Sequence, residues 1–295
     1  MIKKILLVLV SVLVFVSCSN NTTSPDSSNN GNNSGVTPPT VDKEEEELIK
    51  KYGIDISQDD AVISQKIEEN LKAYFAEKNS YRVILTGTPK DYTQNANESL
   101  YTLILKAALK VNTVMNIELD IKNINFQDGS IKAFMFYSFD DKYKNIVISF
   151  AFPENKIKTI EKSSFLGLYN TKEITLPDSV ITIKESAFMY SSIERVTLGN
   201  GLQEIGTFAF MGVDNLKEII IPDSVKSIGM QAFALSQQLT TLTYLGTNPN
   251  NINDKGDVFL GSTKLTTLIV PNAENDKDEG WKTFLGGNFT DIRKN

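Results

Sequence analysis

Few side chains in this sequence could carry out catalysis. Its 295 residues include no His and a single Cys, Cys18. Without His there is no Ser-His-Asp or Cys-His nucleophile, and no imidazole is available to bind a metal. Without a second Cys there is no intrachain disulfide and no cysteine-rich metal site. Any catalysis would therefore depend on carboxylates, Lys or Ser, and we expect no cofactor and no metal.

Three short segments carry the remaining patterns that could support chemistry. Asp140-Asp141 could form a carboxylate pair, although two adjacent acids usually lie in a solvated turn. Residues 274–280 alternate acids as a calcium-binding loop does, but Glu279 stands where that loop needs Gly, and Leu285 where it needs its last Glu. Gly199-Asn200-Gly201 lacks the strand-to-helix context of a phosphate-binding loop. We predict turns at 140–141 and 199–201, a surface loop at 274–280, and a protein that is not an enzyme.

The charge of the chain bears on its partners. Thirty-six Asp and Glu outnumber 30 Lys and Arg, and the formal net charge is −6. Binding to a nucleic-acid backbone requires clustered Lys and Arg, and no basic stripe is visible in the sequence. We predict that the protein has no nucleic-acid partner.

Cys18 lies directly after a segment with the composition of an export signal. Lys3 and Lys4 precede an apolar run, Ile5 to Val16, which only Ser11 interrupts. A run of about a dozen residues is too short to cross a bilayer as a helix, which needs about 20, and it has the proportions of a signal peptide. The sequence therefore predicts export, with an ordinary cleaved signal and an incidental Cys as one alternative.

The residues around the Cys favour a more specific signal. Val16-Ser17-Cys18 resembles the bacterial lipoprotein signal, in which a small residue precedes an invariant Cys, although Phe15 stands where Leu is usual. The resemblance implies cleavage before Cys18 and lipidation of that residue, and two or three acyl chains would anchor the protein stably to a membrane. Ser19 lacks the Asp that marks inner-membrane retention in some bacteria, so the outer membrane or cell surface is favoured over the inner membrane.

The composition divides the chain into five segments. Residues 18–41 are rich in Asn, Ser, Thr, Gly and Pro, so we expect a disordered tether with an average reach of about 25–30 Å. The predicted domains are a signal peptide at 1–17, the lipid-anchored tether at 18–41, an α/β capping domain at 42–130, a solenoid at 131–271 and a C-terminal cap at 272–295.

Apolar periodicity predicts the elements of the capping domain. We expect helices at 42–51, from about 60 to 75 and at 98–110, with strands at 81–86 and 115–121. In the third helix Leu100, Leu103, Ile104, Ala107 and Leu109 should form the buried side. The aromatic segment that follows, Lys132 to Phe152, could be an exposed surface for partners. Two core strands that begin the solenoid are favoured, because Ile146, Ile148, Phe150 and Phe152 alternate.

The second half of the chain repeats one unit. Phenylalanines recur at intervals of 23, 22, 23 and 26 residues, at Phe165, Phe188, Phe210, Phe233 and Phe259. Five or six residues after each Phe comes a short strand pattern, and Pro-Asp-Ser-Val turns follow at Pro177 and Pro222. A unit of 22–26 residues with such a strand is typical of a leucine-rich repeat. We predict an α/β fold, a solenoid of about five coils with a parallel strand ladder, closed by Trp281 in the last core.

The repeat also has a recognisable motif. Ile219 to Phe233, with Ile221-Pro222-Asp223-Ser224-Val225 and Ala232-Phe233, resembles the BspA-like, or Treponema pallidum-type, leucine-rich repeats. The resemblance covers about residues 150–271. It implies a surface protein that adheres to host matrix or plasma proteins, or to other bacteria.

Within each predicted strand the residues between the apolar positions should point outward and form a candidate protein-binding face. They are Glu173, Thr175, Arg195, Thr197, Glu218, Ile220, Thr241, Thr243, Thr267 and Ile269. Five strands at about 4.8 Å each span roughly 20 Å, whereas a stable interface needs about 800 Å² per partner. Binding should therefore be weak and multivalent, or these positions are solvated and bind nothing.

Three functions remain open from the sequence. The favoured one is a membrane-anchored surface lipoprotein that binds a protein of unknown identity. The first alternative is a structural envelope lipoprotein that docks with a periplasmic or outer-membrane partner. An enzyme that uses carboxylates is the second alternative.

Overall fold

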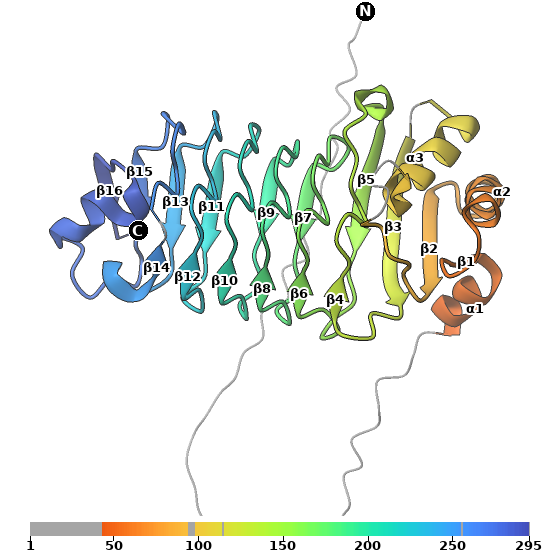
Figure 1. The fold of residues 1–295 in the computed structure, drawn as a ribbon, viewed down its shortest axis with the longest axis horizontal. Helices are drawn as coiled ribbons and strands as arrows, with labels where there is room; N and C mark the ends of the chain where they lie inside the picture. Colours follow the sequence, from red (N-terminus) through yellow and green to blue (C-terminus); the bar gives the residue numbers. More distant parts are fainter. Residues whose placement is uncertain (1–42, 94–97, 114, 255, 295) are drawn as a thin grey trace, which may run out of the picture. The chain divides into compact units, whose positions relative to one another are not determined.

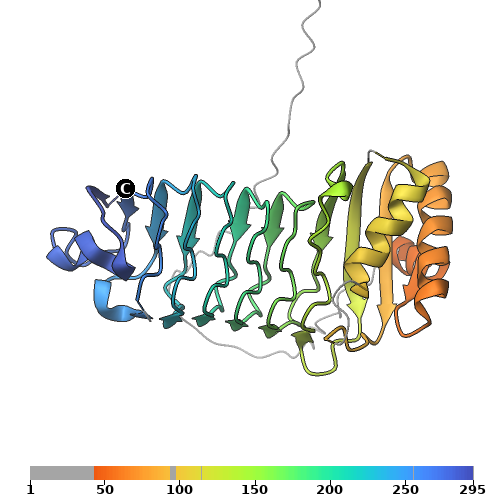
Figure 2. The ribbon, with the colours of Figure 1, turned by 45° about the horizontal axis from the view of Figure 1, so that its top comes forward.

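The computed structural model describes residues 43–294 apart from 94–97, 114 and 255. The predicted signal peptide and tether, with Cys18, lie outside the described residues. Asp42–Asn295 forms one compact unit. Within it, helices gather at the N-terminal end and short strands repeat along the rest (Figures 1 and 2).

Three α-helices and three 3-10 helices have both of their bounds within the described residues. They are α1 (Lys43–Tyr52), α2 (Asp60–Lys78), α3 (Leu100–Val111), η2 (Asp141–Tyr143), η3 (Pro249–Asn251) and η4 (Glu279–Gly286).

The strands form two parallel ladders along the unit (Figure 1). The major ladder contains β1 (Gly53–Asp55), β2 (Tyr81–Gly87), β3 (Met115–Ile124), β5 (Ile146–Ala151), β7 (Glu173–Thr175), β9 (Arg195–Thr197), β11 (Glu218–Ile221), β13 (Thr241–Tyr244), β15 (Thr267–Ile269) and β16 (Asp291–Arg293). The minor ladder contains β4 (Ser130–Ile131), β6 (Thr159–Ile160), β8 (Thr182–Ile183), β10 (Glu204–Ile205), β12 (Ser227–Ile228) and β14 (Asn253–Asp254). From β3 to β14 each coil contributes one strand to each ladder, and the apolar side chains between the ladders form the core.

Helix α3 connects two neighbouring parallel strands, β2 and β3, as the strand-helix-strand prediction requires. Ser99 caps it, because its Oγ accepts a hydrogen bond from the N–H of Thr102 at 3.0 Å. The predicted buried side was wrong in part. Leu103 and Leu109 are half-buried, whereas Tyr101, Leu105 and Ala108 are buried. The helix packs against both α2 and the sheet, so its apolar surface is wider than one stripe.

The recurring phenylalanines form one stack through the solenoid core. The rings of Phe136, Phe165, Phe188, Phe210, Phe233 and Phe259 lie 5.1, 5.0, 5.0, 5.1 and 5.8 Å apart between successive centroids. Such aromatic pairs contribute about 0.5–1.5 kcal/mol each beyond their burial. The stack has six members in the described residues, so the sequence-based count of about five coils omitted the first. Phe136 lies 29 residues before Phe165, outside the regular interval.

The aromatic segment before the repeats was predicted as two strands, and only β5 is one. Residues 132–143 form turns and η2, because they supply the Phe turn of the first coil. The N–H of Phe136 donates to the Ser164 carbonyl at 2.8 Å, as the N–H of Phe165 does to Ala187. In this segment Phe136 and Tyr143 are buried, whereas Phe139 is 47% exposed.

The C-terminal end is closed by an aromatic cluster. Trp281 is fully buried, and its indole N–H donates to the Asn275 carbonyl at 2.9 Å. Its ring lies 5.3 Å from that of Phe284 and 6.2 Å from that of Tyr244 in β13. The prediction that Trp281 seals the last core is confirmed.

Candidate protein-binding strand face

The strand register places all ten predicted face residues on one side of the major ladder. Glu173 is paired with Arg195, and Thr175 with Thr197. Further along, Glu218, Thr241 and Thr267 form one row, and Ile220, Thr243 and Ile269 form the other. The residues of β7, β9 and β11 are exposed, while those of β13 and β15 are half-buried. Whether this face binds a partner stays a prediction.

Two further residues extend this face. Asp291 is paired with Thr267, and Arg293 with Ile269, because β16 adds one more parallel strand. The sequence reasoning missed them since 291–293 lacks the Phe and Pro of the repeat. The alternation Asp291-Ile292-Arg293 was the available signal. Nε of Arg293 donates to Asp291 Oδ2 at 2.9 Å, and this bond lowers the pKa of Asp291.

The face carries few strong electrostatic features. Glu173 forms an ion pair with Arg195 on the neighbouring strand, and Lys172 lies 3.0 Å from Glu194. These pairs are exposed, so each contributes at most about 1 kcal/mol to stability. In the described part of the chain Glu218 has no ion-pair partner.

The major ladder is interrupted twice, between β5 and β7 and between β9 and β11, and the second break divides the predicted face residues. The carbonyl of Lys172 accepts bonds from the N–H groups of Glu194 and Arg195, and the carbonyl of Lys217 accepts from Thr240 and Thr241. Between β9 and β11 the corresponding bonds would run from the N–H groups of Lys217 and Glu218 to the Glu194 carbonyl, and none is present among these described residues. β9 and β11 belong to separate sheets.

The shortest turn of the solenoid lies at this break. Ile193 comes five positions after Phe188, whereas Leu216 comes six positions after Phe210 in the next coil. A side chain partly bridges the two coils, because the Asn215 amide donates to the Ser192 carbonyl at 3.4 Å. The break between β9 and β11 therefore coincides with a one-residue difference in turn length that is visible in the sequence.

A depression of about 570 Å³ lies where β7, β9 and β11 end. Its apolar lining includes Pro177, Val196, Pro222 and Ile220, and Ile220 is 51% exposed. A second hollow of about 470 Å³ lies at the start of β9 and β11, between Glu194 and Gln238. The break between β9 and β11 thus has a hollow at each end.

The turn after β9 packs closely against the turn after β7 at the edge of the depression. A Cβ on Gly199 would lie 2.3 Å from the Pro177 carbonyl oxygen, and one on Gly201 would lie 2.1 Å from that of Asp178. Asp178 Oδ1 accepts a bond from the Asn200 N–H at 2.8 Å. Gly199-Asn200-Gly201 is therefore a turn, as predicted, and its glycines permit close approach to the preceding coil.

The other two chemistry-bearing segments are irregular and lead into the 3-10 helices η2 and η4. Asp140 pairs with Lys142, and Asp278 accepts a bond from the Gly280 N–H at 2.8 Å. The side chain of Asp141 is outside the described set. Among the residues that the structure describes, no three His, Cys, Asp or Glu gather as a metal site would require. No described helix is long and apolar enough to span a bilayer.

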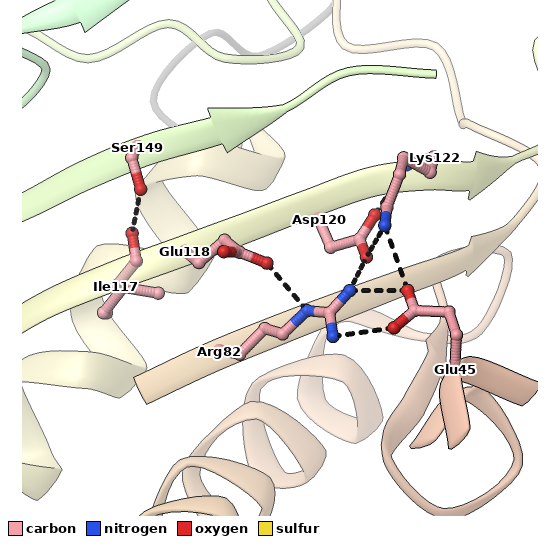
Figure 3. Close-up of polar contacts among 7 residues, drawn as sticks. All are labelled: Glu45, Arg82, Ile117, Glu118, Asp120, Lys122 and Ser149. Atoms are coloured by element: carbon pink, nitrogen blue, oxygen red, sulfur yellow. Dashed lines mark hydrogen bonds and ion pairs between the residues drawn. The ribbon is translucent and has the colours of Figure 1, made fainter. Parts of the chain in front are cut away.

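A second polar cluster joins α1 to the sheet (Figure 3). The Arg82 guanidinium of β2 binds both carboxylate oxygens of Glu45, at 2.6 and 3.0 Å, and it pairs with Asp120 of β3. Lys122 lies 3.0 Å from Glu45 and 3.4 Å from Asp120, and Glu118 lies 2.8 Å from Arg82 Nε. The Arg82 hydrogen bonds lower the pKa of Glu45 to about 2.

This cluster serves the fold. Asp120 is fully buried, and both of its charged neighbours are cations, so its charge is compensated within the protein. Hydrogen bonds from Arg82 to Glu45 and Asp120 outweigh the effect of burial and raise the pKa of Arg82. The charged groups of the cluster pair with one another, and these pairs connect α1 to β2 and β3.

A family model described as "BspA type Leucine rich repeat region" matches residues 108–192 and 129–266, in six copies. The six copies agree in number with the six stacked phenylalanines. No curated protein matches the chain.

Solved structures of bacterial leucine-rich repeat proteins also match. A T. pallidum leucine-rich repeat protein is 20% identical, with a TM-score of 0.38, over 55% of this chain and 61% of that one. The pneumococcal vaccine antigen PcpA is 17% identical, with a TM-score of 0.38, over 56% of this chain and 50% of that one. A protein from Bacteroides ovatus is 17% identical, with a TM-score of 0.33, over 64% of this chain and 59% of that one.

The chain spans about half to three fifths of the length of these three proteins. The two matched ranges of the family model together extend from 108 to 266, more than half of the chain. The chain therefore belongs to the BspA type leucine-rich repeat family.

Proposed function

We propose that this protein is an exported, lipid-anchored surface protein that binds a protein partner through the strand face of its major ladder. Leucine-rich repeats in general bind other proteins. The observation that carries the proposal is the pair of outward rows on β7 to β16, with exposed Ile220 beside the depression. Binding hot spots lie in pockets that a partner can desolvate, and the depression beside Ile220 offers one such place.

The size of the face favours weak binding by each copy. Six strands at about 4.8 Å extend over roughly 25 Å, and each contributes two outward residues. The resulting area is a few hundred Å², below the roughly 800 Å² per partner of a stable interface. Many copies on one membrane would bind a multivalent surface together more tightly than each copy alone. The proposed mode is adhesion by repeated weak contacts.

The proposed address is the outer membrane or cell surface, with Cys18 as the lipidated residue. Its support is the apolar run that ends at Val16-Ser17-Cys18. The proposed partners are host matrix or plasma proteins, or proteins of other bacteria. We propose no enzymatic activity, no cofactor and no nucleic-acid partner.

Lipidation and address can be tested together. Cells that express the full chain, or its Cys18→Ala variant, would be labelled with a fatty-acid analogue and then treated with protease while intact. We expect label and membrane association only with Cys18, and digestion of the wild type on intact cells. Protection from protease, together with cross-linking to one constant envelope protein, would instead support a structural envelope role.

Binding needs a test of its own. The purified chain, arrayed on lipid vesicles and separately as single copies in solution, would be tested against immobilised matrix and plasma proteins. We expect binding by the arrayed form that falls at least tenfold in a Thr197→Lys variant of the strand face. Glu204→Lys, on the exposed minor ladder, is the control. Equal loss in both variants, or no binding by either form, would contradict the proposal.

A further inference from the structure

The depression at the ends of β7, β9 and β11 has a distinctive chemistry. The apolar part consists of aliphatic side chains and prolines, with Ile220 the most exposed. Thr175 and Thr197 from the outward rows and Asn200 from the turn give it neutral polar edges. Two carboxylates, Glu154 and Asp178, complete the rim.

No Lys or Arg belongs to this lining, all of which lies in the described part of the chain. Glu154 and Asp178 also have no ion-pair partner among the described residues. One oxygen of Asp178 is used by Asn200, at 2.8 Å from the backbone N–H and 3.2 Å from the side-chain amide. The two carboxylates therefore lie uncompensated beside an apolar surface, and they would repel an anionic ligand.

The lining also argues against a sugar and against a nucleotide. Aromatic rings commonly form the stacking surface for sugars and bases, and the depression has no aromatic side chain. A phosphate would need cations or aligned backbone N–H groups, and two carboxylates face it instead. A group with an apolar stem and a positive end is complementary to both parts of the lining.

Lys and Arg have this form. Their methylene stems lie along apolar surface while the charged end seeks water or a carboxylate. Arg also binds a carboxylate through two parallel hydrogen bonds, which makes it a common anchor at protein interfaces. The depression opens on the proposed strand face, so a partner that lies on this face could place one such side chain in it.

We infer that the depression receives an Arg or Lys side chain of a protein partner, with the stem over aliphatic side chains of the lining such as Pro177 and the charged end at Glu154. The inference rests on the proposed function and names the chemistry that the partner must present. Asp178 contributes to the negative charge while it holds the turn at Asn200. The break between β9 and β11 supplies the opening.

The experiment uses the purified full chain and a phage library of random linear peptides twelve residues long. Selected peptides would be synthesised, and each Arg would be replaced in turn by citrulline, its neutral isostere. We expect Arg or Lys to be enriched at one position, and citrulline there to weaken binding at least tenfold. If no peptide is selected, or if the preferred residues are acidic, the inference is overturned.

Matched variants locate the contact on the protein. Glu154→Gln should weaken binding of the Arg peptide about as much as citrulline does, and it should not weaken binding of the citrulline peptide further. Glu204→Gln, an exposed carboxylate on the minor ladder, should have no effect. If Glu154→Gln and the citrulline replacement act independently, their groups do not meet and the inference fails.

The apolar part has its own matched pair. Ile220→Thr should weaken binding of both peptides several-fold, whereas Ile269→Thr in the same row should not. Thr is compatible with these strands, because Thr175, Thr197 and Thr243 occupy equivalent positions. Equal effects at 220 and 269 would overturn the inference.

The two proposals can fail separately. If matrix or plasma proteins bind and Thr197→Lys weakens them, but Glu154→Gln and Ile220→Thr do not, the proposed function stands and the inference fails. If Arg peptides bind as described but no extracellular protein does, the depression has the inferred chemistry and the proposed function fails.

Discussion

The core of the solenoid and the N-terminal ionic cluster stabilise the same unit by opposite means. The core repeats one apolar contact five times, with successive ring centroids 5.0–5.8 Å apart from Phe136 to Phe259. The cluster uses charges once, where Arg82 joins Glu45 and Asp120. Repetition spreads stability over equivalent neighbours, whereas the cluster concentrates it in a few groups that compensate one another.

Removal of one ring from the stack should have the largest effect. Phe210 lies between Phe188 and Phe233 and is fully buried. Phe210→Ala would leave a cavity and should lower the free energy of unfolding by about 3–5 kcal/mol. Urea denaturation followed by circular dichroism measures it, with exposed Phe139→Ala as the control. Equal losses in the two variants would contradict a stabilising role for the stack.

Removal of the central cation should come next. Arg82→Met leaves buried Asp120 with only Lys122, 3.4 Å away, so we expect a loss of about 3 kcal/mol. The double variant Arg82→Met with Asp120→Asn should recover part of this loss, because the uncompensated charge is gone. If the double variant is less stable than Arg82→Met, the cost does not arise from the buried charge. Thermal unfolding of the three proteins at one pH gives the comparison.

The cluster should also make stability depend on pH. The pKa of Glu45 falls from 4.5 to about 2 on folding, because of its hydrogen bonds from Arg82. The unfolded chain therefore binds the proton more tightly, and the stabilisation is complete above about pH 5 and is lost as the pH falls toward 2. It amounts to about 2–3 kcal/mol. Glu45→Gln should flatten this part of the stability profile, while Glu204→Gln leaves it unchanged.

The smallest effect should come from the turn next to the stack. Gly212 has a φ of +69°, and a Cβ there would lie 2.5 Å from the Tyr190 ring. Gly212→Ala should cost about 1–2 kcal/mol from its left-handed backbone. Gly256→Ala, with φ +85° and no atom within 4 Å of the added Cβ, separates backbone strain from the clash. A difference between the two in thermal unfolding would measure the contribution of Tyr190.

These regions also differ in how far the sequence predicts them. The Phe stack was predictable from five of its six members, because each coil makes the same contact and its residues recur at nearly the same interval. Phe136 was not predicted as a member of the stack because its coil is longer. Part of the buried surface of α3 was not predicted because two neighbouring elements cover the helix. The Arg82 cluster occurs once and joins residues 37 and 38 positions apart in the sequence, so no period marks it.

The candidate site divides in the same way. The ten face residues follow from alternation along short strands, since neighbouring side chains of a strand point to opposite faces. Alternation alone does not show that β16 extends the face, that the ladder opens between β9 and β11, or that Ile220 is left exposed beside two carboxylates.

The sequence by itself determined the repeat, its parallel strands, the outward rows and the closing role of Trp281, because periodic apolar residues admit few ways to bury them. The tertiary structure alone decided where the ladder breaks and which charges meet. Both depend on how coils of unequal length stack and on contacts between residues far apart in the chain, which local spacing does not encode.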